Sequence, residues 1–154
     1  MSHFTVMVIG DEPEKKLAPF QENNMGDCPD EFLQFTEDED YDVDEKTGKK
    51  GYWNNPNSKW DWYSLGGRWS GMIKLKNGAN GKAGKGSLVM QNEVGIDQAN
   101  KKDIENFSEL TTFAVIKDGK WYEDAQWASE LQKLVMELPD ETSISIYDCH
   151  KSPC

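Results

Sequence analysis

The pattern that most constrains the fold of this chain is LTTFAVIKDGKWYE, which occupies residues 110–123. Residues 110–117 are rich in β-branched and aromatic side chains, and residues 120–123 can form a short return strand. Asp118 and Gly119 lie between them, and an Asp-Gly dipeptide favours the two-residue turn that joins antiparallel strands. This segment therefore predicts a β-hairpin.

Three other segments have the composition of strands. Residues 3–9 (HFTVMVI) are apolar and β-branched with little alternation, as in a strand buried on both faces. Residues 70–76 alternate between apolar and lysine side chains, which predicts a strand with one wet face. Residues 142–150 (TSISIYDCH) place Ile144 and Ile146 on one face of a further strand. Together with the hairpin, these segments predict a sheet.

One segment repeats apolar side chains at helical spacing, and it covers residues 124–138 (DAQWASELQKLVMEL). The apolar positions are Trp127, Leu131, Leu134, Val135 and Leu138. Pro139 would end this helix. Elsewhere we expect only short helical pieces: one that begins at Pro13 and is limited by Pro19, and a turn or two within residues 97–106.

The order of these elements and the length of 154 residues predict one α+β domain over residues 1–154. Its sheet would be mixed or antiparallel, with one main C-terminal amphipathic helix and a long acidic loop. The acidic, flexible loop is placed at residues 36–51, and a Gly- and Lys-rich hairpin loop is placed at residues 77–87.

Both loops superficially match ligand motifs. A calcium loop that starts at Asp38 needs glycine at its sixth position and glutamate at its twelfth, where this chain has Val43 and Lys49. A phosphate loop at Gly84-Lys85 also fails, because neither Ser nor Thr follows the lysine. A solvated charge run and a flexible connection are therefore favoured.

Charge is distributed unevenly along the chain, whose formal net charge is −11. Residues 51–102 contain three acidic and eight basic residues, whereas the segments on either side are strongly acidic. Repulsion by the overall charge opposes direct binding to nucleic acid, because such binding depends on attraction to phosphates. The basic middle segment still allows a local pocket for one small anion.

The cysteines and the apolar runs define the expected compartment. No run of about eighteen apolar residues and no basic leader are present, so we expect a cytoplasmic protein without a membrane partner. Cys28, Cys149 and Cys154 form no CxxC pair and are expected to be reduced thiols. Cys149, His150 and Cys154 would lack a fourth zinc ligand, and alternation points Cys149 away from Asp148 and His150. We therefore expect no metal and no cofactor.

The sequence KWDWYSLGGRW at residues 59–69 is the strongest candidate for a ligand site. It contains Arg68, the only arginine in the chain, and aromatic rings that can stack on planar bases. Its two adjacent glycines let backbone N–H groups approach a ligand closely. The predicted ligand-binding residues are Trp60, Asp61, Trp62, Tyr63, Gly66, Gly67, Arg68 and Trp69. The simpler alternative is that the tryptophans are core residues and that Asp61 pairs with Arg68 across a turn.

A second candidate site combines residues from the strands at 3–9 and 142–150. If these strands are parallel neighbours, Asp11 lies near Asp148 and His150. If they are antiparallel, His3 approaches His150 instead. A carboxylate beside an imidazole is the pair that general acid–base chemistry requires. The alternative without function is two surface histidines, and the sequence does not decide between these arrangements.

Five segments together resemble a family of small uncharacterised proteins encoded in phage genomes and some bacterial genomes. They are MSHFTVMVIGD, NPNSKWDWYSLGGRWSG, DQANKKDI, TFAVIKDGKWYE and LPDETSISIYDCH, in this order along the chain. The family has no established activity or cofactor, so the resemblance implies no catalytic residues, and residues 22–50 look like a shortened or divergent insertion. The resemblance implies a phage protein in the host cell cytoplasm. By analogy, such accessory proteins act against host defence, by binding a nucleotide immune signal or by blocking a defence protein.

These observations lead to three hypotheses for function. The first is a protein that sequesters a nucleotide-like anionic small molecule in the aromatic site, and a homodimer is compatible with such a pocket. The second is an acidic decoy, in which residues 37–45 imitate phosphates and block a host defence protein such as a nuclease. The third is a small hydrolase that uses Asp11, Asp148 and His150. We expect binding rather than catalysis.

Overall fold

The computed structural model describes residues 2–24, 26–86, 95–123 and 130–151. Its strands are β1 (Ser2–Ile9), β2 (Gln34–Glu37), β3 (Gly51–Asn54), β4 (Trp62–Gly67), β5 (Lys82–Ala83), β6 (Lys85–Gly86), β7 (Ile96–Asn100), β8 (Ala114–Lys117), β9 (Lys120–Glu123) and β10 (Ser143–Lys151). Its helices are α1 (Pro13–Leu17) and α2 (Glu130–Met136), with 3-10 turns η1 (Ala18–Phe20), η2 (Asp30–Phe32), η3 (Lys101–Asp103) and η4 (Phe107–Glu109).

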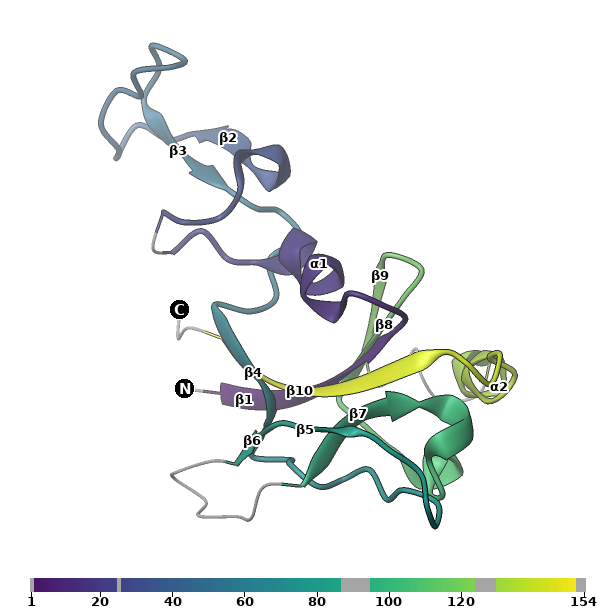
Figure 1. Ribbon diagram of the computed structural model, residues 1–154. Coiled ribbons are helices and arrows are strands. Elements are labelled where there is room, and N and C mark those ends of the chain that lie inside the picture. Colours follow the sequence, from purple (N-terminus) through teal and green to yellow (C-terminus); the bar gives the residue numbers. More distant parts are fainter. Residues whose placement is uncertain (1, 25, 87–94, 124–129, 152–154) are drawn as a thin grey trace.

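Strand β10 is the centre of the main sheet, which has eight strands within the described residues (Figure 1). Along one edge, β10 pairs antiparallel with the whole of β1, from Lys151 opposite Ser2 to Ile144 opposite Ile9. Its other edge is shared, because β7 pairs with its first half and β4 with its second half. Strand β8 continues the sheet parallel to β1, and β9 follows antiparallel to β8. The sheet is therefore mixed.

Two apolar cores cover opposite faces of this sheet. On one face, Met7 and Ile146 belong to a core that includes Val135 of helix α2. On the other face, Val6 and Tyr147 belong to a core that α1 and η1 help to cover. Residues 6–8 of β1 are at most 1% exposed, which confirms the prediction of a strand buried on both faces.

The β8–β9 hairpin is also confirmed. Lys117 and Lys120 pair across the turn, and Asp118 and Gly119 have φ angles of 53° and 76°. Positive φ at both turn residues matches the right-handed twist of the flanking strands, and Asp-Gly favours this geometry. The first strand is shorter than predicted, because it begins at Ala114.

The predicted α+β class with one main C-terminal helix is wrong, because the structure is mostly β. Helix α2 has seven residues, and residues 124–129 of the predicted helix, including Trp127, lie outside the described part. Val135 is buried, but Leu134 is 52% exposed, so the predicted apolar face is only partly used. No helix in the described ranges is long and apolar enough to cross a membrane.

Two predicted local elements are replaced by others. Residues 70–76 form no continuous strand and contribute only isolated bridges at Ile73 and Leu75, because the chain turns after β4. Residues 97–106, expected to hold a helical turn, instead contribute most of β7 and then η3. Strand β7 forms because long-range pairing with β10 supplies its hydrogen bonds, which local spacing does not reveal.

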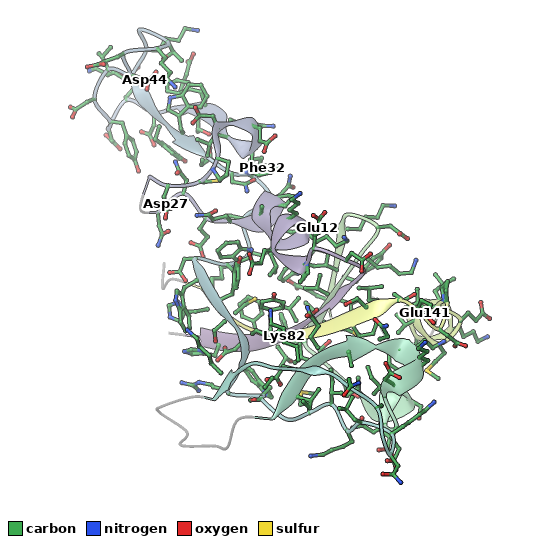
Figure 2. All side chains as sticks on the ribbon, in the orientation of Figure 1. Glu12, Asp27, Phe32, Asp44, Lys82 and Glu141 are labelled. Atoms are coloured by element: carbon green, nitrogen blue, oxygen red, sulfur yellow. The ribbon has the colours of Figure 1, made fainter. Side chains whose placement is uncertain are left out.

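The acidic segment belongs to a hairpin that projects away from the main sheet (Figure 1). Strands β2 and β3 pair antiparallel at its base. Asp44, labelled at its far end in Figure 2, accepts backbone hydrogen bonds from Lys46 and Thr47 at 3.0 and 2.9 Å. The other oxygen of Asp44 accepts the Trp53 Nε1–H at 2.8 Å. One carboxylate of the acidic run therefore organises the hairpin.

The burial pattern predicts unequal costs for two truncations. Ile146→Ala should lower the free energy of unfolding by about 2–5 kcal/mol, because it leaves a cavity beneath the central strand. The matched variant Leu134→Ala should change it by only about 0.5 kcal/mol, because Leu134 faces solvent. Urea titration measures both values, and a loss for Leu134→Ala as large as that for Ile146→Ala would contradict the described packing.

Candidate functional site

The pairing of β1 with β10 brings the two histidines of the chain together. His3 lies opposite His150 in the register, and their ring centroids are 5.2 Å apart. Asp11 lies beyond Ile9, the other end of β1, which is about 20 Å along the strand from His3 at the usual rise per residue. The structure therefore assembles the antiparallel alternative, and Asp11 does not join this group.

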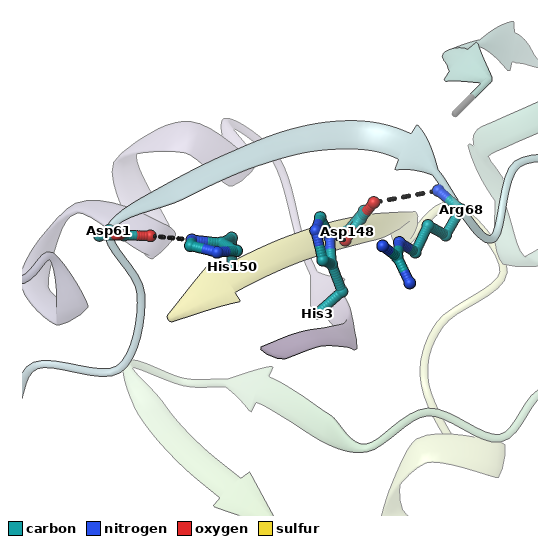
Figure 3. Close-up of polar contacts among 5 residues, drawn as sticks. All are labelled: His3, Asp61, Arg68, Asp148 and His150. Atoms are coloured by element: carbon teal, nitrogen blue, oxygen red, sulfur yellow. Dashed lines mark hydrogen bonds and ion pairs between the residues drawn. The ribbon is translucent and has the colours of Figure 1, made fainter. Parts of the chain in front are cut away.

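Each histidine is held by a carboxylate (Figure 3). His3 Nδ1 lies 2.8 Å from Asp148 Oδ1, and His150 Nδ1 lies 2.6 Å from Asp61 Oδ1. The exposed fractions of the four side chains are between 3% and 16%. The Asp61 N–H also donates to the His150 carbonyl oxygen at 2.8 Å, which fixes this pair further. We call these four residues the His–Asp cluster.

The carboxylates determine which nitrogen of each ring remains available. A carboxylate accepts a hydrogen bond, so Nδ1 carries the proton in both contacts and Nε2 carries a lone pair when the ring is neutral. Nε2 of His150 is buried and has no hydrogen-bond partner among the described residues. An unpartnered buried polar atom is costly and uncommon in proteins, so this atom calls for a functional explanation.

Most aromatic residues of the 59–69 stretch belong to the core. Trp60 is 6% exposed, and its Nε1–H donates to the Leu17 carbonyl oxygen at 2.9 Å. Tyr63 packs edge-on against Trp60 and Tyr147. Trp69 packs against the core on the opposite face of the sheet. These three predicted ligand-binding side chains therefore stabilise the fold. For Trp60 and Trp69 this agrees with the simpler alternative, in which the tryptophans are core residues.

Trp62 is placed differently from the other aromatic residues of this stretch. It is 53% exposed and pairs with His150 in the register of β4 and β10. Its ring lies edge-on to His3, with 6.3 Å between the ring centroids. Trp62 therefore provides an accessible aromatic surface beside the His–Asp cluster.

Gly66 and Gly67 let the chain pass very close to two buried carboxylates. Their φ angles are +80° and +51°, a region that favours glycine. A Cβ atom on Gly66 would lie 2.2 Å from Asp97 Oδ2, and one on Gly67 would lie 2.4 Å from Asp148 Oδ2. The two glycines do allow a close approach to the backbone. The groups that approach it are carboxylates of the protein itself and not a ligand.

Asp97 fixes the turn that follows β4, and sequence reasoning missed it. Its side chain is fully buried and accepts hydrogen bonds from Ser70 Oγ at 2.7 Å, Gly71 N at 2.8 Å and Gly84 N at 3.0 Å. Burial raises the pKa of Asp97, and the three hydrogen bonds partly oppose this rise. No motif marks Asp97 in the sequence, because its partners become neighbours only in the folded sheet.

Arg68 directly follows Gly67 and lies next to the His–Asp cluster. Its backbone N–H donates to Asp148 Oδ2 at 3.0 Å, so Asp148 contacts both His3 and the Arg68 backbone. Figure 3 shows the Arg68 side chain extending back alongside Asp148 towards His3. Asp61 pairs with His150 instead of forming the predicted pair with Arg68. The guanidinium therefore adds positive charge on the His3 side of the cluster.

The buried thiol of Cys149 lies on the other face of β10. Cys149 is fully buried in the second core, and burial raises the pKa of its thiol well above the usual range. A thiol in this state is a poor nucleophile. Cys154 lies outside the described residues, and within those residues no group of three or more His, Cys, Asp or Glu side chains is arranged to hold a metal ion.

A scan against protein-family models and searches of curated proteins and of solved structures found no significant match to this chain. Function is therefore inferred from the geometry of the site.

The buried carboxylate of Asp97 predicts a specific pH dependence of stability. Because its pKa is raised by folding, its contribution to stability is complete below the unfolded-state pKa and is lost as pH rises through the folded-state pKa. The free energy of unfolding of the native protein minus that of Asp97→Asn should therefore fall as pH rises from about 4 to about 7. Urea titrations across this range measure the difference, and a difference that rises with pH would contradict the assignment.

Proposed function

We propose that the protein binds a nucleotide-like anionic small molecule at the His–Asp cluster. The observation that carries this proposal is the juxtaposition of Arg68 and the exposed ring of Trp62 with two carboxylate-held imidazoles. An exposed tryptophan can stack on a base, and a guanidinium can make paired hydrogen bonds to phosphate. These are the two chemical parts of a nucleotide.

The charge of the cluster makes phosphate binding depend on protons. With neutral imidazoles, two carboxylates outnumber the single guanidinium of Arg68, which disfavours an anion. When an imidazole gains a proton, its Nδ1–H still donates to the carboxylate, and its Nε2–H can donate to a phosphate oxygen. Lys85, which is exposed and pairs with Gly66 in the register of β6 and β4, adds further positive charge nearby. Phosphate binding should therefore take up protons.

The resemblance to phage-encoded proteins supports a particular class of ligand. A nucleotide immune signal of the host cell contains both a base and phosphates, and a protein that held it would suppress the defence response by sequestration. The formal net charge of −11 repels long nucleic acids, which favours a small molecule over a polymer. We place this activity in the host cell cytoplasm.

Two substitutions test the binding proposal. Arg68→Ala should weaken affinity about tenfold or more, because a hydrogen bond to a charged group contributes about 1.5–3 kcal/mol. Trp62→Ala should weaken it about fivefold or more, because stacking of one base contributes about 1–3 kcal/mol. Calorimetry with the four nucleoside 5′-monophosphates, cyclic di-AMP and cyclic di-GMP measures these affinities, and adenosine serves as the ligand that lacks phosphate.

The matched control is Tyr41→Ala, which removes a 48% exposed aromatic ring from the projecting hairpin. It should leave every affinity unchanged. Equal affinities for adenosine and AMP, or undiminished binding by Arg68→Ala, would contradict the proposal, as would failure of the native protein to bind any member of the panel.

The β2–β3 hairpin supports a second candidate function, the acidic decoy that blocks a host defence protein. The hairpin projects away from the main sheet (Figure 1). Glu37, Asp38 and Glu39 line a hollow together with Lys49 and Lys50. Lys49 partly neutralises this group, because its Nζ lies 2.9 Å from Glu37 Oε1. The triple variant D38N/E39Q/D40N separates the candidates. It should keep nucleotide affinity, and loss of host-nuclease inhibition in this variant alone would favour the decoy.

A further inference from the structure

We propose that His3 and His150 form an acid–base pair that cleaves a phosphodiester bond next to a ribose 2′-hydroxyl. This inference rests on the proposed binding of a nucleotide-like molecule and adds a reaction to it. Cleavage of this kind needs one group that takes a proton and one that gives a proton. The facing imidazoles of β1 and β10, with ring centroids 5.2 Å apart, provide two such groups on one face of the sheet.

Both rings are held in the orientation that proton transfer requires. Nδ1 of each ring is occupied by a carboxylate, at 2.8 Å for His3 and 2.6 Å for His150, so Nε2 is the atom that exchanges protons with a bound molecule. A carboxylate at Nδ1 also stabilises the imidazolium that forms when Nε2 takes a proton. Asp61 and Asp148 are therefore positioning residues, whereas the two histidines would touch the substrate.

The unpartnered nitrogen of His150 suggests how the two roles divide. Nε2 of His150 is buried without a hydrogen-bond partner in the described part of the chain. A buried nitrogen with a lone pair is tolerated better than a buried N–H without an acceptor, so we assign His150 as the base and His3 as the acid. Because this atom is covered in the free protein, substrate binding must uncover it.

The reaction balances without any further reactant. Nε2 of His150 takes the proton of the 2′-hydroxyl while the 2′-oxygen forms a bond to phosphorus. The bond from phosphorus to the 5′-oxygen of the next nucleoside breaks, and Nε2 of His3 gives its proton to this leaving oxygen. The products are a 2′,3′-cyclic phosphate and a free 5′-hydroxyl. Arg68 would stabilise the negative charge that accumulates on the phosphate oxygens.

A ribose 2′-hydroxyl fits this site because it is part of the substrate. An intramolecular nucleophile needs only deprotonation and alignment, and correct alignment alone accelerates such reactions greatly. Two imidazoles and one guanidinium supply the necessary base, acid and cation. A deoxyribose substrate with the same base and phosphate would bind but would lack the nucleophile.

The experiment uses the full chain with the dinucleoside monophosphates ApA and UpA and their 2′-deoxy analogues. Chromatography should detect 2′,3′-cyclic phosphates and adenosine from the ribose forms only. His3→Asn and His150→Asn should each slow cleavage at least about 100-fold, the usual contribution of one acid or base. Lys46→Ala, which alters an exposed lysine on the projecting hairpin and is purified identically, should retain the full rate.

A pH profile provides a readout that a structural role would not change. The charged groups around the imidazoles are Asp61 beside His150, and Asp148 and Arg68 beside His3. Because one ring must be neutral while the other is protonated, the rate should rise and then fall with pH. Each histidine variant should lose one limb of this profile, so His3→Asn alone carries the test if His150→Asn fails to fold.

The outcomes separate this inference from the binding proposal. Binding of the 2′-deoxy analogues without cleavage of ApA or UpA by the native protein would overturn the reaction and leave binding intact. Absence of binding to every analogue, together with absence of cleavage, would overturn both. Equal cleavage by the native protein and both histidine variants would reveal a contaminating nuclease and would also overturn the inference.

Discussion

The antiparallel pairing of β1 with β10 joins the two central strands of the main sheet. It runs without interruption from Ser2 opposite Lys151 to Ile9 opposite Ile144. Because side chains alternate along a strand, a slip of one residue would move each apolar set to the opposite face and separate His3 from His150. The same register therefore specifies both cores and the His–Asp cluster.

One face of this strand pair changes from apolar to polar along its length. Met7 and Ile146 are opposed at the apolar end, Thr5 and Asp148 follow, and the two histidines occupy the last position of this face. Asp148 is 2% exposed and lies at the boundary, where its oxygens contact His3 and the Arg68 backbone. The packed core therefore continues directly into the cluster, which gives its side chains rigid support.

Sequence patterns predicted the elements whose information is local. The β8–β9 hairpin and the apolar strand β1 follow from composition and turn chemistry within a few residues. Strand β7 and the turn after β4 could not be predicted in this way, because β7 pairs with β10 and Asp97 bonds to Gly71 and Gly84 only after the chain has folded. The helical spacing of residues 124–138 predicted a longer helix and a wider apolar face than the described residues show, since helix α2 covers Glu130–Met136 and Leu134 faces solvent.

Only part of the candidate site could be predicted from the sequence, because local patterns mark single stretches but not their partners in the folded sheet. The stretch containing Trp62 and Arg68 stood out by composition, but its division into core and surface depends on which face of the sheet each residue occupies. The choice between Asp11 and His3 as a neighbour of His150 required the relative direction of two strands far apart in the chain. No local pattern encodes that direction.

The most direct test of this account is the protonation of the two imidazoles, measured by nitrogen-15 NMR. The chain has two histidines, so the imidazole region contains two rings that the variant His3→Asn assigns. We expect the Nδ1–H form for both neutral rings and a selective change at Nε2 when AMP is added, with no such change for adenosine. The Nε2–H form in either ring, or identical spectra with AMP and adenosine, would contradict it.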